Sequence, residues 1–226
     1  PFDGLRFDPE CAGAGSSGVY FSGSAAAKIL ESVTNDFTIE LWMSRVSAVA
    51  PPGGRSFVFS MASGTAGIDW LIGHDGGTTF TAVVRVNGVG EELSVTAAPR
   101  ADGLTNLVFV RSGDEHRFYV NGARAVSRIV PHADPVDASW DPSYALFLGN
   151  SSDETRPFDG DFHLAAMYGE ALSDALIRFL DTIGPSIPSS DSVPAPIADI
   201  CPDPREIRRG VDADGSLSHS LIGGGG

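Results

Sequence analysis

The residues of this sequence best suited to chemistry are aspartates grouped in one segment. Asp134, Asp137 and Asp141 lie close together, and carboxylate oxygens of this kind are preferred ligands of Ca²⁺ in proteins. The segment lacks the fixed ligand spacing of a helix–loop–helix calcium site, so solvated turn aspartates are the alternative. We name these three residues as candidate calcium ligands and expect no other cofactor.

Catalytic carboxylates are not expected. Sandwich enzymes that cleave glycans present two or three carboxylates on one strand, as E-x-D-x-x-E, because alternation brings them to one face. The sequence has no such triplet, and Glu91 and Glu92 would point to opposite faces of a strand. It has no G-x-S-x-G nucleophile motif either, and its five histidines lack metal-ligand spacing. A Ser-His-Asp group could still assemble in space, but we expect no enzymatic activity.

Two tryptophans are candidates for a sugar-binding platform. Aromatic rings commonly line sites for small ligands, and a platform needs one ring face exposed. Trp70 lies in an apolar run that ends at Gly73, and Trp140 directly precedes Asp141. Burial in the core is the alternative for both rings.

The two cysteines, Cys11 and Cys201, lie near opposite ends of the chain. Two is the smallest number that can pair, and neither has a neighbour typical of a metal site. We predict a disulfide between them, with two unrelated buried thiols as the alternative. A disulfide would place the chain in the periplasm, at the cell surface or outside the cell.

The formal net charge of −14 limits the partners. An acidic surface repels nucleic acid phosphates and anionic lipid headgroups, so we expect neither to bind. No stretch approaches the roughly 18 consecutive apolar residues of a membrane-spanning helix, so no transmembrane segment is expected.

Short strands must position these residues. The segment 37–43, F-T-I-E-L-W-M, has the period of two that predicts a β-strand. Similar short runs follow, separated by turn signals such as Asn87-Gly88 and Asn121-Gly122. The total of about nine or ten strands predicts an all-β sandwich. One helix is expected, with Ser173 as its N-cap. Its predicted apolar face consists of Leu176, Ile177, Phe179 and Leu180.

Four stretches carry a resemblance to a known family. They are F-T-I-E-L-W at 37–42, the strand 106–110 with F-Y-V-N-G at 118–122, W-D at 140–141 with L-G-N at 148–150, and R-P-F-D-G at 156–160 running through Tyr168 to A-L-S-D-A at 171–175. Together they resemble the laminin-G-like, concanavalin A-like jelly rolls of bacterial secreted proteins, over roughly residues 5–182. The family pattern is broken near Leu104, where a tryptophan is usual, and at His163 and Leu164, which replace an acidic pair. The resemblance implies a two-sheet antiparallel jelly roll with one short C-terminal helix.

The composition changes after Ile183, so we divide the chain into a sandwich, 1–183, and a Pro/Gly/Ser-rich extended tail, 184–226. The tail lacks the apolar content of a core, but isolated apolar residues could enter successive pockets of a partner. These predicted docking-arm residues are Ile187, Val193, Ile197, Ile200 and Ile207. The alternative is that the tail wraps its own domain.

The expected function is binding without catalysis, outside the cytoplasm. Our first expectation is a protein-docking extrinsic subunit of a larger membrane-associated assembly, such as an electron-transfer or photosynthetic complex. Its partner would contact the C-terminal arm and the N-terminal segment. A lectin-like carbohydrate-binding domain is the alternative, and a glycan hydrolase or lyase is the least expected.

Overall fold

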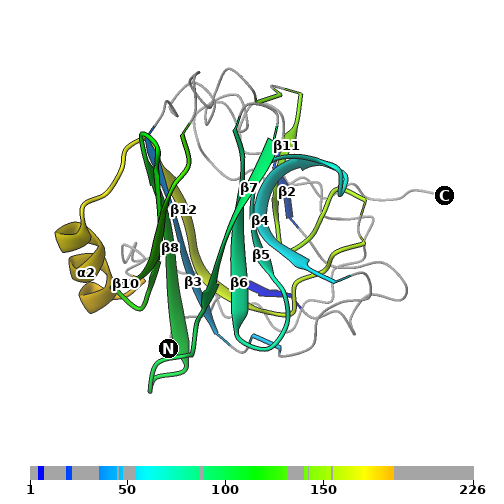
Figure 1. The fold of residues 1–226 in the computed structure, drawn as a ribbon. Helices are drawn as coiled ribbons and strands as arrows, with labels where there is room; N and C mark the ends of the chain where they lie inside the picture. The colour runs from blue at the N-terminus through cyan, green and yellow to red at the C-terminus, as the bar shows by residue number, and fades with distance from the viewer. Residues whose placement is uncertain are drawn as a thin grey trace, which may run out of the picture.

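The chain folds as two antiparallel β-sheets packed face to face in a jelly-roll sandwich (Figure 1). The computed structural model describes residues 5–7, 19–21, 36–44, 46–47, 54–86, 89–131, 140–141, 143–153 and 155–185. Sheet A contains, in spatial order, β1 (Leu5–Phe7), β12 (Gly160–Tyr168), β3 (Phe37–Ser44), β8 (Leu104–Ser112), β9 (Glu115–Val120) and β10 (Ala123–Ile129). Sheet B contains β2 (Val19–Phe21), β11 (Ala145–Leu148), β4 (Ser56–Ser63), β5 (Gly67–His74), β6 (Thr79–Val86) and β7 (Val89–Thr96). The predicted all-β sandwich is confirmed.

The core lies between the two sheets, because alternate residues of each strand point to one face. From sheet A, Phe37, Ile39 and Leu41 of β3 are buried in it. From sheet B, Phe80 and Val84 of β6 meet them. Burying one side chain of this size contributes about 1.5–3 kcal/mol, so the alternation seen in the sequence is the main source of stability.

Trp70 and Trp140 belong to this core, so the prediction that they form an exposed sugar platform is wrong. Trp70 is 0% exposed, and its ring packs edge-on against Phe59 at 4.9 Å between centroids. Trp140 is 5% exposed and donates from Nε1 to the carbonyl oxygen of Arg85 at 3.3 Å. Neither ring offers a face to a ligand. Their size made burial as consistent with the sequence pattern as exposure.

The predicted turns connect strands as expected. β6 and β7 pair up to Val86 and Val89, on either side of Asn87 and Gly88, which lie outside the described residues. Asn121 and Gly122 have φ values of +50° and +73°, which suit the tight turn between β9 and β10. β10 itself was not predicted. Nearly all of its side chains are exposed, so it carries no alternating apolar pattern.

Helix α2 (Asp174–Ile183) lies against the outer face of sheet A, away from sheet B (Figure 1). The predicted N-cap is confirmed, because Ser173 Oγ accepts a hydrogen bond from the Leu176 backbone N–H. The predicted apolar face is only partly right. Ile177 is buried among sheet residues that include Val108 and Tyr119. Leu176 and Phe179, however, are 40% and 57% exposed.

Two polar residues of the F-T-I-E-L-W strand tie sheet A to the segment that closes the domain. Glu40 is 1% exposed; its Oε1 accepts from Trp42 Nε1 at 2.9 Å, and its Oε2 accepts from the Tyr168 hydroxyl at 2.6 Å. Burial and this hydrogen bond raise the pKa of Tyr168, so its hydroxyl remains a donor at neutral pH. Thr38 Oγ1 donates to the Glu170 carbonyl oxygen at 2.8 Å. This part of the family resemblance therefore has a structural role.

Candidate ligand pocket

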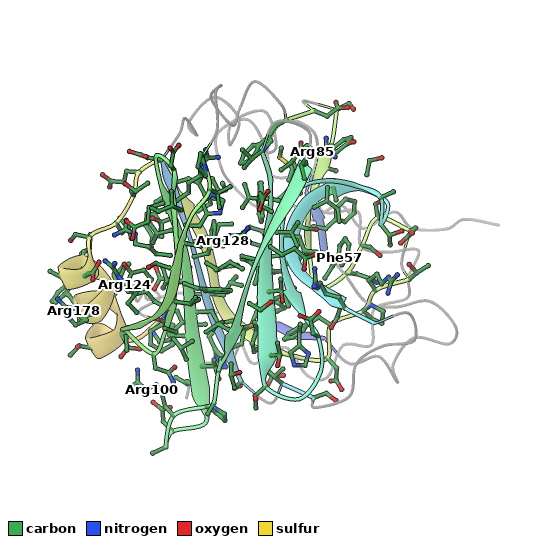
Figure 2. All side chains as sticks on the ribbon, viewed as in Figure 1. Phe57, Arg85, Arg100, Arg124, Arg128 and Arg178 are labelled. Carbon is green, nitrogen blue, oxygen red and sulfur yellow. The ribbon has the colours of Figure 1, made fainter. Side chains whose placement is uncertain are left out.

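A pocket of about 560 Å³ opens at one end of the sandwich, where β3 ends and where β6 and β8 begin. This volume falls within the range of about 300–1,000 Å³ that is usual for small-molecule sites. This end of the sandwich is the lower one in Figure 1. Arg100, labelled in Figure 2, lies near it. The lining residues come from both sheets and from the segments between β5 and β6 and between β7 and β8. Those that carry the argument are Ser44, Thr78, Phe80, Asp102, Leu104 and His163.

The polar centre of the pocket is a contact between a serine and a histidine. Ser44 Oγ lies 2.8 Å from His163 Nε2, and it donates toward Asp161 Oδ2 at 3.4 Å. When His163 Nε2 carries the proton, the imidazole donates to Ser44 and the hydroxyl proton points to Asp161. The three side chains form a half-buried set of donors and acceptors at the pocket wall.

A β-bulge places His163 in this group. Phe162 of β12 pairs with Met43 of β3, and Leu164 pairs with Trp42, so His163 is an extra residue between two regular stretches of pairing. A bulge bends the strand locally and changes the direction of a side chain, and bulges are frequent beside binding sites. The irregularity therefore explains how a residue of a regular strand reaches Ser44.

The rest of the lining combines apolar residues with Thr78, Asp102 and Thr105. Phe80 is buried at its inner side, and its ring packs against the imidazole of His74 at 4.8 Å between centroids. Burial lowers the pKa of His74, so this second imidazole is neutral at pH 7. Val46, Leu104 and the exposed Pro99 complete the apolar lining. A ligand would meet hydroxyl, imidazole and carboxylate groups together with apolar side chains.

The opposite end of the sandwich carries a second charged group, around Arg85 (Figure 2). Buried Asp69 places Oδ1 3.2 Å from Arg85 Nη1, and its Oδ2 accepts from the Asp141 backbone N–H at 2.8 Å. Burial raises the pKa of Asp69 to about 6, although the hydrogen bond from Asp141 and the charge of Arg85 both lower it. The Asp141 segment is therefore distant from the pocket at Ser44.

The raised pKa of Asp69 predicts a specific pH dependence of stability. The folded pKa of about 6 lies above the unfolded value of about 3.9, so the folded state binds more protons between these values. The contribution of Asp69 to stability is then fully present below about pH 4 and is lost as the pH rises past 6. Relative to Asp69→Asn, we expect the wild-type free energy of unfolding to fall by about 2–3 kcal/mol from pH 4 to pH 7 in urea unfolding. Identical pH profiles for the two proteins would contradict the assignment.

Of the three predicted calcium ligands, Asp141 is the one that the structure describes. Its Oδ1 accepts from the backbone N–H and the hydroxyl of Ser143, at 2.9 and 2.6 Å, and these bonds lower its pKa. Within the described parts of the chain, no group of three or more His, Cys, Asp or Glu residues is placed to hold a metal ion. Asp134 and Asp137 lie outside those parts, so the calcium site stays a prediction.

Other predicted residues also lie outside the described residues. They are Cys11, Cys201, Ile187, Val193, Ile197, Ile200 and Ile207. The disulfide, the docking arm and the boundary between sandwich and tail therefore stay predictions. None of the helices in the described ranges is long and apolar enough to cross a membrane.

Sequence reasoning did not locate the pocket, although it noticed two of its residues. Leu104 and His163 mark the two places where the chain departs from the family pattern, and both line the pocket. Ser44, Thr78 and Asp102 gave no signal, because single polar residues at strand ends and turns are common everywhere. The contact between Ser44 and His163 joins positions 119 residues apart, which no local pattern indicates.

Comparison with known proteins places this fold in context. A model of the concanavalin A-like lectin/glucanases superfamily (Laminin_G_3) matches residues 15–178. A search of curated proteins returned no match. The CBM40 domain of an IT-sialidase from Ruminococcus gnavus, solved bound to α2,3 sialyllactose, is a similar structure. It has a TM-score of 0.59 and 14% identity, and the alignment covers 79% of this chain and 95% of that one.

Two further solved structures are similar. A heptameric SAP-like pentraxin from Limulus polyphemus has a TM-score of 0.55 and 13% identity, over 80% of this chain and 83% of that one. The NanB sialidase from Streptococcus pneumoniae has a TM-score of 0.58 and 15% identity, over 77% of this chain. The present chain spans only 27% of the NanB chain. Identities this low indicate a shared fold and leave the ligand to be argued from the pocket.

Proposed function

Because the chain belongs to the concanavalin A-like lectin/glucanases superfamily, we propose that it is a non-catalytic carbohydrate-binding domain whose ligand occupies the pocket beside Ser44 and His163. The observation that carries the proposal is the mixed lining of this pocket, which combines polar and apolar side chains. Sugar rings present hydroxyl groups at their edges and C–H groups on their faces. The hydroxyl of Ser44 and the imidazole of His163 suit the edges, and Phe80 and Leu104 suit the faces.

The geometry of the pocket favours binding over catalysis. Glycoside hydrolysis uses a pair of carboxylates on either side of the scissile bond. Among the described lining residues, Asp102 is the one carboxylate. Ser44, His163 and Asp161 do come together, as a Ser-His-Asp group would, but the Asp161 carboxylate contacts the Ser44 hydroxyl itself. In a catalytic triad the carboxylate orients the histidine from its far nitrogen.

This proposal replaces our first expectation of a docking subunit. One of the three similar structures reported above is a carbohydrate-binding module, which supports the lectin-like alternative. The predicted arm lies outside the described residues, so it adds no support. An extracytoplasmic location is part of the proposal, since the predicted disulfide between Cys11 and Cys201 would need an oxidising compartment.

Filling the pocket should abolish sugar binding. Thr78 is an exposed lining residue in the segment between β5 and β6, so Thr78→Trp adds bulk at the pocket mouth without entering the core. A glycan array would first show which glycans the wild-type protein captures. For each of them we expect the affinity of Thr78→Trp to be at least about tenfold lower, which corresponds to about 1.4 kcal/mol. Titration calorimetry on the best of them would measure the loss.

The matched control is Val89→Trp. Val89 is 60% exposed at the start of β7, at the other end of the sandwich, so the same bulk is added away from the pocket. Unchanged binding by both variants would show that sugars bind elsewhere. A wild-type protein that captures no glycan at all would overturn the proposed function.

A further inference from the structure

Helix α2 carries apolar side chains that the sandwich leaves uncovered. Leu176, Phe179 and Ile183 are 40%, 57% and 48% exposed. Of the five large hydrophobic side chains that are exposed in the described parts of the chain, three lie on this ten-residue helix. Single exposed apolar residues are common on protein surfaces, whereas a group of them marks a surface that contacts something else.

The three side chains lie along one side of the helix. Residues three and four apart in sequence are neighbours on a helix surface, and Leu176, Phe179 and Ile183 have this spacing. Ile177 lies on the side that faces sheet A, inside a buried apolar cluster, and half-buried Leu180 packs at the edge of that cluster. The exposed apolar face of α2, defined by Leu176, Phe179 and Ile183, therefore continues an existing apolar contact outward.

The chain that follows α2 starts at one end of this face. Gly184, with a φ of +73°, ends the helix and donates its N–H to the Leu180 carbonyl oxygen at 3.0 Å. Pro185 is buried, so the backbone leaves the helix against the protein and not into solvent. Residues 186–226 follow directly and lie outside the described residues. The tail of this same chain is therefore tethered at the last turn of α2, beside the exposed face.

The first part of the tail has the composition and the length to cover the face. The segment 187–193, I-P-S-S-D-S-V, has an apolar residue at each end, and prolines in and around it favour an extended backbone. At about 3.1 Å per residue, Ile187 and Val193 would lie about 19 Å apart. A helix of this length is about 15 Å long, so the two side chains can reach its last and first turns. Extended proline-rich segments are preformed for binding and dock on aromatic side chains, such as Phe179 here.

Tethering and charge favour the tail over a separate molecule. A tethered segment competes at an effective concentration on the order of millimolar, and the formal net charge of −14 repels a second copy of the chain. We propose that residues 187–193 form a strap across the exposed apolar face of α2, with Ile187 packed near Ile183 and Val193 packed near Leu176. None of the residues of this face lines the sugar pocket, so the strap is independent of the proposed function.

A photo-crosslinker on the full chain identifies what covers this face. Phe179→p-benzoylphenylalanine places a light-activated group on the face, at a side chain that is exposed and outside the core. Unlabelled and isotope-labelled protein would be mixed in equal amounts, irradiated, digested and analysed by mass spectrometry. We expect crosslinks to peptides that contain residues 187–193, with both peptides carrying the same label, because the contact lies within one chain. Val89→p-benzoylphenylalanine is the matched control, since Val89 is 60% exposed on β7 and should not form this crosslink.

Removing the two apolar anchors identifies the part of the tail that is involved. Ile187→Asp combined with Val193→Asp should lower the crosslink yield from Phe179 within one chain at least about tenfold, because both apolar contacts are lost. Ile207→Asp makes the same change outside the strap and should leave the yield unchanged. Products that join a labelled to an unlabelled chain would assign the face to a second copy and overturn the proposal. So would the absence of crosslinks to residues 187–193, an equal yield from the control position, or an equal loss in Ile207→Asp.

Discussion

Replacing Glu40 with alanine is expected to lower the free energy of unfolding by about 3–5 kcal/mol. Glu40 is buried and accepts hydrogen bonds from Trp42 Nε1 and from the Tyr168 hydroxyl. Its removal leaves the buried Trp42 Nε1 and the half-buried Tyr168 hydroxyl without this acceptor, and a buried donor left unsatisfied costs about 1–3 kcal/mol. Guanidinium unfolding followed by tryptophan fluorescence would measure the change, since Trp42 itself loses a partner.

Glu92→Ala is the matched control for this prediction. Glu92 accepts from Arg55 on the surface and its side chain is 54% exposed, so we expect a loss of less than about 1 kcal/mol. Glu40→Gln should fall between the two, because its amide keeps one acceptor and turns an NH₂ group toward the other donor. If Glu40→Ala is as stable as Glu92→Ala, the two hydrogen bonds that Glu40 accepts contribute little to the stability of the fold.

Much of the fold could be predicted from the sequence, because most strands show a local alternation of apolar and polar residues. β3 and β6 each place apolar residues of the core at alternate positions, and the period of two shows this directly. β10 was missed because it lies at the edge of sheet A with both faces exposed. Edge strands of this kind use charge instead of apolar residues, as Arg124 and Arg128 do here. Nothing in such a segment distinguishes a strand from a polar loop.

Burial was harder to predict than strand position. Trp70 and Trp140 lie in the core, whereas Leu176 and Phe179 are exposed on α2. A sequence shows that a residue is apolar, but only the packing of the sheets and the helix shows which apolar residues are buried. Beneath α2, sheet A contacts Ile177 and part of Leu180. The other two residues of the predicted apolar face, Leu176 and Phe179, remain exposed.

The candidate site depends on contacts that the sequence does not display. Ser44 ends one strand and His163 interrupts another, and only the pairing of β3 with β12 brings them together. The useful signals were the departures from the family pattern at Leu104 and His163. A family pattern describes the shared fold, so residues that break it at strand ends are reasonable candidates for a ligand site particular to one chain.

The role of the bulge can be tested by deleting His163. The pairs on either side, Phe162 with Met43 and Leu164 with Trp42, become consecutive once the extra residue is removed. The deletion should therefore restore regular pairing without reversing the faces of later residues, as a one-residue slip would. We expect cooperative unfolding to persist, with a loss of about 1–2 kcal/mol. Affinity for the best glycan should fall by at least about tenfold, since a ligand hydrogen bond is lost and the pocket wall is reshaped.

His163→Ala separates the two contributions, because it keeps the bulge and removes only the imidazole. We expect this variant to lose affinity by a smaller factor than the deletion, and to unfold within about 1 kcal/mol of wild type. Wild-type affinity in a folded deletion variant would exclude both His163 and the bulge from the site. The deletion variant could fail to fold while His163→Ala folds and binds normally. In that case the extra residue is needed for the folding of β12, and other parts of the pocket bind the ligand.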